Sequence, residues 1–228
     1  MENKLCVIIV EPYQKPRLSY IGNELKEIQS IVGYGIEMMT NTDSKFVFIC
    51  SQYGKTLGLP ETNINIDGCN WSFCGTFVIA RKSGEKIVSL DDSDIELLGI
   101  ANKSLSYNDK SRLFVYQVRE NEENIRNRLY MNYRWHASNN LPIMREHYRQ
   151  VYTETFRDIS EEEFQTECEE LYIRFNQDQK PKSYYGHSLS VSDILVFQKG
   201  ESCRVFFCDS IGYVEIDPRI WEANTCIN

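Results

Sequence analysis

The sequence predicts an α+β protein of two small units, the first a mixed sheet with helices and the second a helix with a short antiparallel sheet. Strand-like runs of β-branched and aromatic residues recur in both halves, and turn residues separate them. Helical spacing of apolar residues is confined to a few short segments. A polar stretch over residues 117–125 has the composition of a linker, which places the first unit at residues 1–116 and the second at residues 126–228.

The first unit is expected to begin with a buried strand at residues 5–10 and to continue with a helix that ends at Gly33. Asn23 is the predicted N-cap of this helix, because its short polar side chain can accept a hydrogen bond from the first turn. The apolar face of the helix has helical spacing: Ile21, Leu25, Ile28 and Val32. The remaining expected elements are strands at residues 45–50 and 71–80 and a short helix after residues 91–93.

The second unit contains the best-marked helix of the chain. Ser160 and Glu163 have the spacing of a capping box, in which each residue satisfies a backbone N–H of the first turn. A single apolar stripe follows: Phe164, Cys168, Leu171 and Phe175. Three short strands separated by turn residues then predict an antiparallel meander, at residues 194–197, 204–208 and 213–216.

Composition limits the classes of function. A formal net charge of −8 argues against broad, sequence-independent nucleic-acid binding, which needs clustered basic residues. The longest strongly apolar run, residues 5–10, is too short to cross a bilayer, and no secretory signal pattern is present. We therefore expect a cytoplasmic protein that does not contact a membrane. Most of the eight cysteines lie in or beside strand-like runs, where reduced cysteine acts as a small core residue.

The first half resembles a small domain of unknown function that is common on plasmids, phages and conjugative elements of Gram-positive gut bacteria. The resemblance rests on these segments: residues 10–12, 27–33, 58–63 and 74–77. This family usually has Gly-Gly-Tyr-Ile-Glu where the chain has Gly33-Tyr34-Gly35-Ile36-Glu37, a shift of one glycine.

The second half is similar to the YodL-like domain. The most specific match is the run from Gly186 to Val196, and shorter matches lie at residues 148–152, 171–176 and 208–213. Neither resemblance implies a known reaction or cofactor. Both imply a setting, namely cargo of mobile genetic elements.

A segment in the second half combines arginines with aromatic residues. Side chains of these types suit a protein interface or phosphate contact with base stacking, although an aromatic half-core with solvated arginines has the same composition. The candidate partner-binding residues are Arg126, Arg128, Tyr130, Tyr133, Arg134, Trp135, Arg145, Tyr148 and Arg149. We expect a protein or ribonucleoprotein partner, with any direct contact to nucleic acid being local.

A polar segment before the meander holds the residue types of a catalytic site, which are His187, Ser188 and Asp193, with Asp209 from a neighbouring strand. A small hydrolase or nucleotide-modifying enzyme is one interpretation. The other, which we favour, is that these short polar side chains hydrogen-bond a tight turn at the start of a strand. Removal of His187 and Asp193 would then lower stability and leave activity unchanged.

Two further patterns carry weaker expectations. Cys69 and Cys74, like Cys203 and Cys208, lie five positions apart, which puts the two side chains on opposite faces of a strand, so neither a metal site nor a cofactor is expected. Residues 158–170 carry seven acidic side chains and no basic one, a pattern typical of a solvated helix face.

The favoured function is therefore that of a non-enzymatic accessory protein of a mobile element that binds a macromolecular target. Its concrete form is an inhibitor of a host defence nuclease such as a CRISPR effector (anti-CRISPR-like). The alternatives are the enzyme built on His187, Asp193 and Asp209, and a structural assembly module of a conjugative element.

Overall fold

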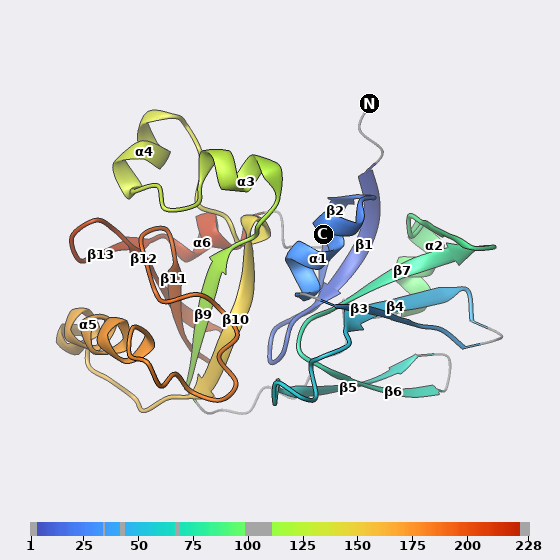
Figure 1. Cartoon of the computed structure of the whole chain (residues 1–228), viewed down its shortest axis with the longest axis horizontal. Coiled ribbons are helices and arrows are strands. Elements are labelled where there is room, and N and C mark those ends of the chain that lie inside the picture. Colours follow the sequence, from blue (N-terminus) through green and yellow to red (C-terminus); the bar gives the residue numbers. More distant parts are fainter. Residues whose placement is uncertain (1–3, 34, 42–43, 67–68, 99–110, 224–228) are drawn as a thin grey trace. The chain divides into compact units, whose positions relative to one another are not determined.

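The computed structural model describes residues 4–33, 35–41, 44–66, 69–98 and 111–223 (Figure 1). They form two compact units, the first within residues 4–98 and the second within residues 111–223. Each unit is a sheet with helices, which confirms the α+β class. In the described parts of the chain, no helix combines the length and the apolar character that a membrane crossing requires.

The first unit is built on a sheet with the strand order β2-β1-β7-β4-β3, with β8 paired to β7. Its elements are β1 (Lys4–Val10), β2 (Arg17–Gly22), α1 (Leu25–Val32), β3 (Ile36–Met39), β4 (Phe46–Ser51), β7 (Phe77–Ser83), β8 (Lys86–Val88) and α2 (Asp92–Leu98). The sequence predicted a mixed sheet here, but all pairings of these described strands are antiparallel. The helix α1 joins β2 and β3, which lie at opposite edges of the sheet and do not pair, so it creates no parallel neighbours.

A separate hairpin of β5 (Glu61–Ile66) and β6 (Cys69–Cys74) packs on the sheet. The rings of Phe48 and Phe73 lie 5.3 Å apart, and those of Phe73 and Phe77 lie 4.3 Å apart, so aromatic stacking joins the hairpin to the sheet. The strand predicted at residues 71–80 is thus two strands. Gly75 separates them, with a φ of +86° and no room for a Cβ beside Leu59.

The first helix differs from its prediction at its start. The strand β2 continues to Gly22, so Ile21 is buried through strand pairing, and Glu24 rather than Asn23 occupies the N-cap position. Leu25 is 59% exposed, and the buried face consists instead of Ile28, Ser30, Ile31 and Val32. The predicted end is confirmed, because Gly33 has a φ of +95° and its N–H bonds to the carbonyl of Gln29.

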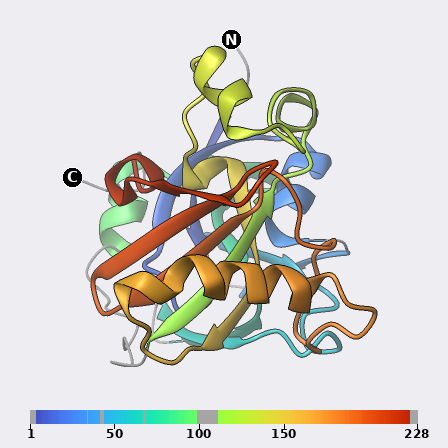
Figure 2. The same cartoon turned by 90° about the vertical axis from the view of Figure 1, so that its left-hand side faces the viewer.

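The second unit is a five-stranded antiparallel sheet with the order β10-β9-β11-β12-β13. Its elements are β9 (Arg112–Val118), α3 (Glu122–Asn127), α4 (Tyr133–Ser138), β10 (Tyr148–Thr155), α5 (Phe164–Phe175), β11 (Ile194–Lys199), β12 (Ser202–Cys208), β13 (Tyr213–Ile216) and α6 (Pro218–Trp221). The predicted meander is confirmed as β11, β12 and β13. The helix α5 crosses one face of the sheet (Figure 2), whereas Trp221 of α6 packs on the other face with Tyr116 and Tyr148.

The predicted capping box and stripe are present. The Ser160 and Glu163 side chains each satisfy a backbone N–H of the first turn, which is the 3₁₀ segment Glu161–Glu163 that leads into α5. Cys168, Leu171 and Phe175 are buried on the sheet, and the half-buried Phe164 packs beside them.

The linker predicted at residues 117–125 does not separate the two units. Gln117 and Val118 end β9, which lies between β10 and β11, and residues 122–127 form α3. The polar character of this stretch has a different cause. Gln117 is fully buried and bonds to other polar groups, while Asn121 caps α3 by accepting from the N–H of Asn124. The division between the units precedes β9.

Candidate functional site

Asp193 is the last residue of the polar segment before β11. Its side chain is fully buried, and Oδ2 lies 2.9 Å from both the backbone N of Ser190 and Nε2 of Gln117, each of which donates to it. The N–H of Asp193 donates in turn to the carbonyl of Ser190 at 3.1 Å. Asp193 therefore shapes the turn through which the chain enters the sheet.

The side chain of Gln117 joins the members of this polar cluster. The sequence had suggested that this residue belongs to a linker. Its Oε1 accepts from the backbone N of His187 at 3.0 Å, and its Nε2 lies 2.9 Å from the carbonyl oxygen of His187. A Cβ on Gly186 would lie 2.2 Å from Oε1, so only glycine allows this close approach. The sequence held one sign of this role, which is a long amide side chain within the apolar run that forms β9. A buried amide needs hydrogen-bond partners.

His187 lies beside the same carboxyl group. Its Nδ1 is 2.8 Å from the carbonyl oxygen of Ser188, which can only accept, and 3.8 Å from Oδ2 of Asp193. Burial is the main cause that lowers the pKa of His187, and burial also raises the pKa of Asp193 well above its ordinary value. Both shifts favour the neutral forms of the two groups.

The structure brings His187 and Asp193 together, with Gln117, but it places the other two candidates elsewhere. Ser188 contributes its backbone carbonyl, and Oδ1 of Asp209 accepts from the N–H groups of Tyr133 and Ser210. The hydroxyl of Ser190 is 3.4 Å from Nδ1 of His187, the nitrogen that also faces Asp193. A proton relay needs hydroxyl and carboxylate on opposite ring nitrogens, so this geometry suits a turn better than a catalytic triad.

The arginine-aromatic segment is divided by burial. Arg126, Tyr130, Tyr133, Arg134 and Trp135 are exposed. The other four candidates are buried, with exposed fractions between 0% and 7%: Arg128, Arg145, Tyr148 and Arg149. These four cannot contact a partner across the surface of the folded unit, so the structure removes them from the predicted binding set.

The buried members of the segment hold the unit together. Arg128 donates to the carbonyl of Pro142 at 2.9 Å, and Arg145 pairs with Glu222 at 3.2 Å. The guanidinium of Arg149 lies 3.5 Å from the carboxylate of Glu120 and 5.9 Å from the ring centre of Tyr185. A buried guanidinium group needs acceptors, which a backbone carbonyl supplies to Arg128 and carboxylates supply to Arg145 and Arg149.

The exposed members lie on α3, α4 and the turn between them, which are tied to the sheet at two points. The N–H of Tyr130 donates to Oγ of Ser192 at 3.0 Å, and the N–H of Tyr133 donates to Oδ1 of Asp209 at 3.1 Å. Within the segment, Nε1 of Trp135 donates to the carbonyl of Asn127 at 3.1 Å. Asp209 thus positions an exposed ring and takes no part in the polar cluster around His187.

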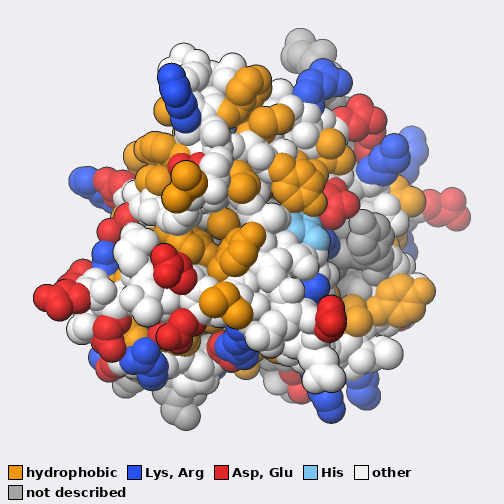
Figure 3. Space-filling view, turned by 60° about the vertical axis from the view of Figure 1, so that its left-hand side comes forward, with side chains coloured by type: hydrophobic (Ala, Val, Ile, Leu, Met, Phe, Trp, Pro, Cys, Tyr) orange, Lys and Arg blue, Asp and Glu red, His pale blue; other side chains and the backbone are white. Residues whose placement is uncertain are grey.

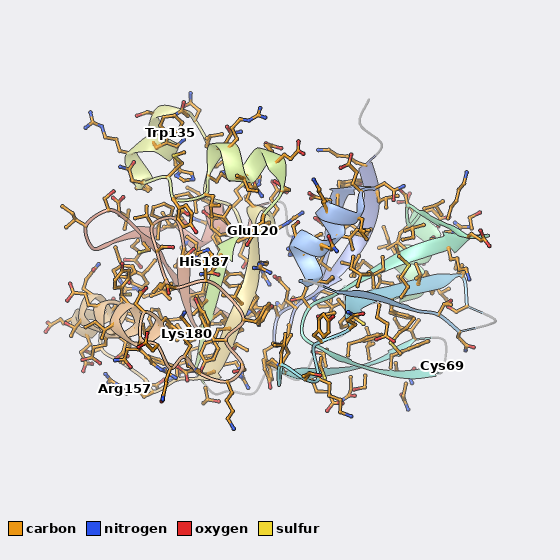
Figure 4. The ribbon with its side chains drawn as sticks, viewed as in Figure 1. Cys69, Glu120, Trp135, Arg157, Lys180 and His187 are labelled. Atoms are coloured by element: carbon orange, nitrogen blue, oxygen red, sulfur yellow. The ribbon has the colours of Figure 1, made fainter. Side chains whose placement is uncertain are left out.

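These elements expose aromatic side chains and arginines, and the first turn of α3 also exposes the acidic Glu122 and Glu123. The exposed fractions are 57% for Tyr130, 43% for Trp135 and 38% for Tyr133. We call it the α3–α4 surface, and its residues are Ile125, Arg126, Tyr130, Tyr133, Arg134 and Trp135. Figure 3 shows several hydrophobic side chains close together on one face, with a histidine beside them, and Figure 4 shows Trp135 on α4.

The described residues contain no group of three or more His, Cys, Asp or Glu side chains suited to holding a metal ion. Seven cysteines in these ranges are free thiols, and burial raises the pKa of several, such as Cys50 and Cys208.

Comparisons with known families cover most of the chain. One family model, described as a domain of unknown function (DUF3846), matches residues 3–101, and another, described as the YodL-like domain, matches residues 112–218. No curated protein and no solved structure matches the chain. The two family matches agree with the resemblances found in the sequence, and the chain is therefore a DUF3846 domain followed by a YodL-like domain.

Proposed function

We propose that this protein is a non-enzymatic accessory protein of a mobile genetic element that binds a macromolecular target through the α3–α4 surface. The concrete form of the proposal is an inhibitor of a host defence nuclease such as a CRISPR effector, acting in the cytoplasm. The mobile-element setting comes from the resemblance of both domains to families carried by such elements, which is an argument by analogy.

The observation that carries the proposal is the exposure of three aromatic rings on a segment that the sheet holds in place. The backbone N–H groups of Tyr130 and Tyr133 are bonded and their rings contact His187 and Phe207, so a partner would have little left to order. Tyrosine, tryptophan and arginine are the residues that most often dominate binding energy at protein interfaces. Arg126 and Arg134 are exposed on the same segment, and the exposed acids Glu122 and Glu123 of α3 balance their charge.

This combination favours a protein or ribonucleoprotein target over free nucleic acid. Two exposed arginines would neutralise few phosphates, whereas binding to nucleic acid alone generally needs several. The enzyme built on His187, Asp193 and Asp209 has less support, because Asp209 bonds to α4 and Asp193 is engaged in the turn.

The test measures DNA cleavage by purified CRISPR effector ribonucleoproteins at increasing concentrations of the purified chain. We expect the chain to slow cleavage by at least one effector and to form a complex with it in size-exclusion chromatography. Tyr133→Ser should raise the concentration for half-inhibition by roughly tenfold or more, as loss of an interface hot spot does. Tyr172→Ser is the matched control, because Tyr172 on α5 is similarly exposed, at 42%.

Arg134→Ala provides a second variant, since the Arg134 side chain is exposed and its loss leaves the helix intact. Absence of inhibition and of complex formation with every effector would refute the anti-CRISPR form. Equal losses for Tyr133→Ser and Tyr172→Ser would refute the choice of surface. Turnover of a substrate that His187→Ala abolishes would favour the enzyme instead.

A further inference from the structure

A pocket of about 270 Å³ lies in the second unit, at the end of the sheet where β11 turns into β12. Its walls come from the beginning of β9, the β10–α5 connection, the first turn before α5 and the β11–β12 turn. Figure 4 shows Arg157, which lines the pocket, and Trp135 at opposite ends of this unit. The pocket is therefore separate from the α3–α4 surface.

Three phenylalanine rings form the apolar part of the wall. The rings of Phe156 and Phe164 each lie 5.2 Å from the ring of Phe197, in edge-to-face contacts. Phe197 is buried, whereas Phe156 and Phe164 are half-buried. A planar ligand can thus gain aromatic contact without any change in the core.

The guanidinium of Arg204 adds a second kind of planar surface. It lies 4.1 Å from the ring centre of Phe164 and is held by Glu215, with Nε donating to a carboxylate oxygen at 2.7 Å. An arginine fixed in this way can stack with a heteroaromatic ring or pair with a phosphate.

The lining carries more basic than acidic side chains, and three acids outside it pair with two of the bases, Glu163 and Glu167 with Arg157 and Glu215 with Arg204. Four lining side chains are basic (Arg112, Arg157, Lys199, Arg204) and two are acidic (Asp158, Glu161). These two acids already pair with bases: Asp158 with Lys199, and Glu161 with Arg204. The Lys199, Asp158 and Glu161 side chains are 62%, 63% and 83% exposed, so these pairs contribute little to stability and an anionic ligand can replace an acid in either pair.

We infer that this pocket binds a nucleoside monophosphate, with the base against the phenylalanine rings and the phosphate on Lys199 and Arg204. The volume is slightly below the ~300 Å³ at which pockets for drug-sized ligands begin, which suits a single nucleotide and not a dinucleotide. Base stacking and charge-assisted hydrogen bonds to phosphate are the two interactions that the wall offers. This inference does not depend on the proposed function, and the two can fail separately.

Isothermal titration of the full chain with AMP, GMP, CMP and UMP at low salt tests the inference. At least one should bind, and both its nucleoside and ribose 5-phosphate should bind at least roughly tenfold more weakly, because each lacks one of the two interactions. A nucleoside that binds as tightly as its monophosphate would overturn the proposal, as would the absence of binding by all four nucleotides.

Variants locate the site. Lys199→Gln and Phe164→Leu should each raise the Kd roughly tenfold. Lys182→Gln is the matched control, because Lys182 is exposed in the same unit and does not line the pocket. Glu161→Gln should leave binding equal or tighter, since it removes a competitor for Arg204. Equal losses for Lys199→Gln and Lys182→Gln, or binding unchanged by Lys199→Gln, would refute this site.

A further titration separates a free nucleotide from the end of a strand. A 5′-phosphorylated oligonucleotide should bind no more tightly than the monophosphate, because the pocket holds one nucleotide. Much tighter binding of the oligonucleotide would overturn the assignment to a free nucleotide.

Discussion

Asp193 combines full burial with a pKa that burial raises well above the ordinary 3.8. Its Oδ2 accepts hydrogen bonds from Nε2 of Gln117 and from the N–H and the hydroxyl of Ser190, while Oδ1 is buried without a hydrogen-bond partner among the described residues. A buried carboxyl group with one unsatisfied oxygen is costly to ionise. The side chain therefore makes the stability of the second unit depend on pH.

The sign of this dependence follows from the raised pKa. Between pH 3.8 and the higher pKa of the folded state, the unfolded chain has released the proton and the folded chain still holds it. The contribution of Asp193 to the free energy of unfolding therefore falls as pH rises through this range. Asp193→Asn stays neutral, so its stability relative to the wild type should increase with pH, by up to about 1.4 kcal/mol per pH unit.

Urea unfolding at several pH values between about 4 and 7 measures this difference. A Trp71→Phe background leaves Trp135 and Trp221 as the tryptophans, so that fluorescence reports the second unit. A stability difference between the two proteins that does not change with pH would contradict the assignment of a raised pKa to Asp193.

Gly186 provides a second residue-scale prediction. Gly186→Ala would put a Cβ 2.2 Å from Oε1 of Gln117 and 3.0 Å from Cγ2 of Val151, so the polar cluster or β10 must shift. We expect a loss of about 1–3 kcal/mol in urea unfolding. Gly200→Asn is the control, because Gly200 has a φ of +59°, which asparagine tolerates, and no atom close to its Cβ position. Similar losses in both variants would show that the contact with Gln117 is unimportant.

At this scale the sequence located the turn but not all the residues that hold it. Short polar side chains before a strand predicted a turn, and Asp193 forms one. Gln117 was missed because its partners lie about seventy positions away, as in the bond from the N–H of His187. Arg128 and Arg149 were misassigned for a related reason: the backbone carbonyls and carboxylates that bury a guanidinium group become neighbours only in the folded chain.

Among the elements, helices and strands with local signals were predicted well. The capping box and apolar stripe located α5, and alternating turn residues located the meander. Elements that depend on tertiary contacts were not predicted well. Ile21 has helical spacing but belongs to β2 and pairs with β1, and Gly75 divides a run that the sequence suggests is one strand. Strand pairing overrides local periodicity at both positions.

The capping box yields a prediction at the element scale. Ser160→Ala removes the side-chain acceptor at the N-cap, and we expect a loss of about 1 kcal/mol in the free energy of unfolding. Ser160→Thr should restore most of it, because threonine keeps the hydroxyl group. Ser188→Ala is a matched control, since the Ser188 contact with His187 uses its backbone carbonyl, and we expect a change within about 0.5 kcal/mol. A loss for Ser188→Ala as large as that for Ser160→Ala would contradict this.

At the scale of the whole molecule, each unit has its own cores. Two clusters of buried apolar residues lie within the first unit and two within the second, and each is built on one sheet. The two-unit organisation was predictable from the pattern of elements. The boundary between the units was not predictable. The amide and acidic side chains that suggested a linker belong to the buried Gln117 and to the start of the capped helix α3.

The position of β9 between β10 and β11 allows the boundary between the units to be tested with fragments. A fragment of residues 107–223 retains the strand that pairs with both β10 and β11, and it should unfold cooperatively in urea with dispersed amide signals by NMR. A fragment of residues 126–223, which begins at the boundary suggested by composition, lacks that strand and leaves β10 without a partner in the sheet. It also exposes the apolar residues that pack against Leu113 and Val115, so it should remain unfolded or aggregate. Cooperative folding of the shorter fragment would show that β9 is dispensable and that the boundary belongs after it.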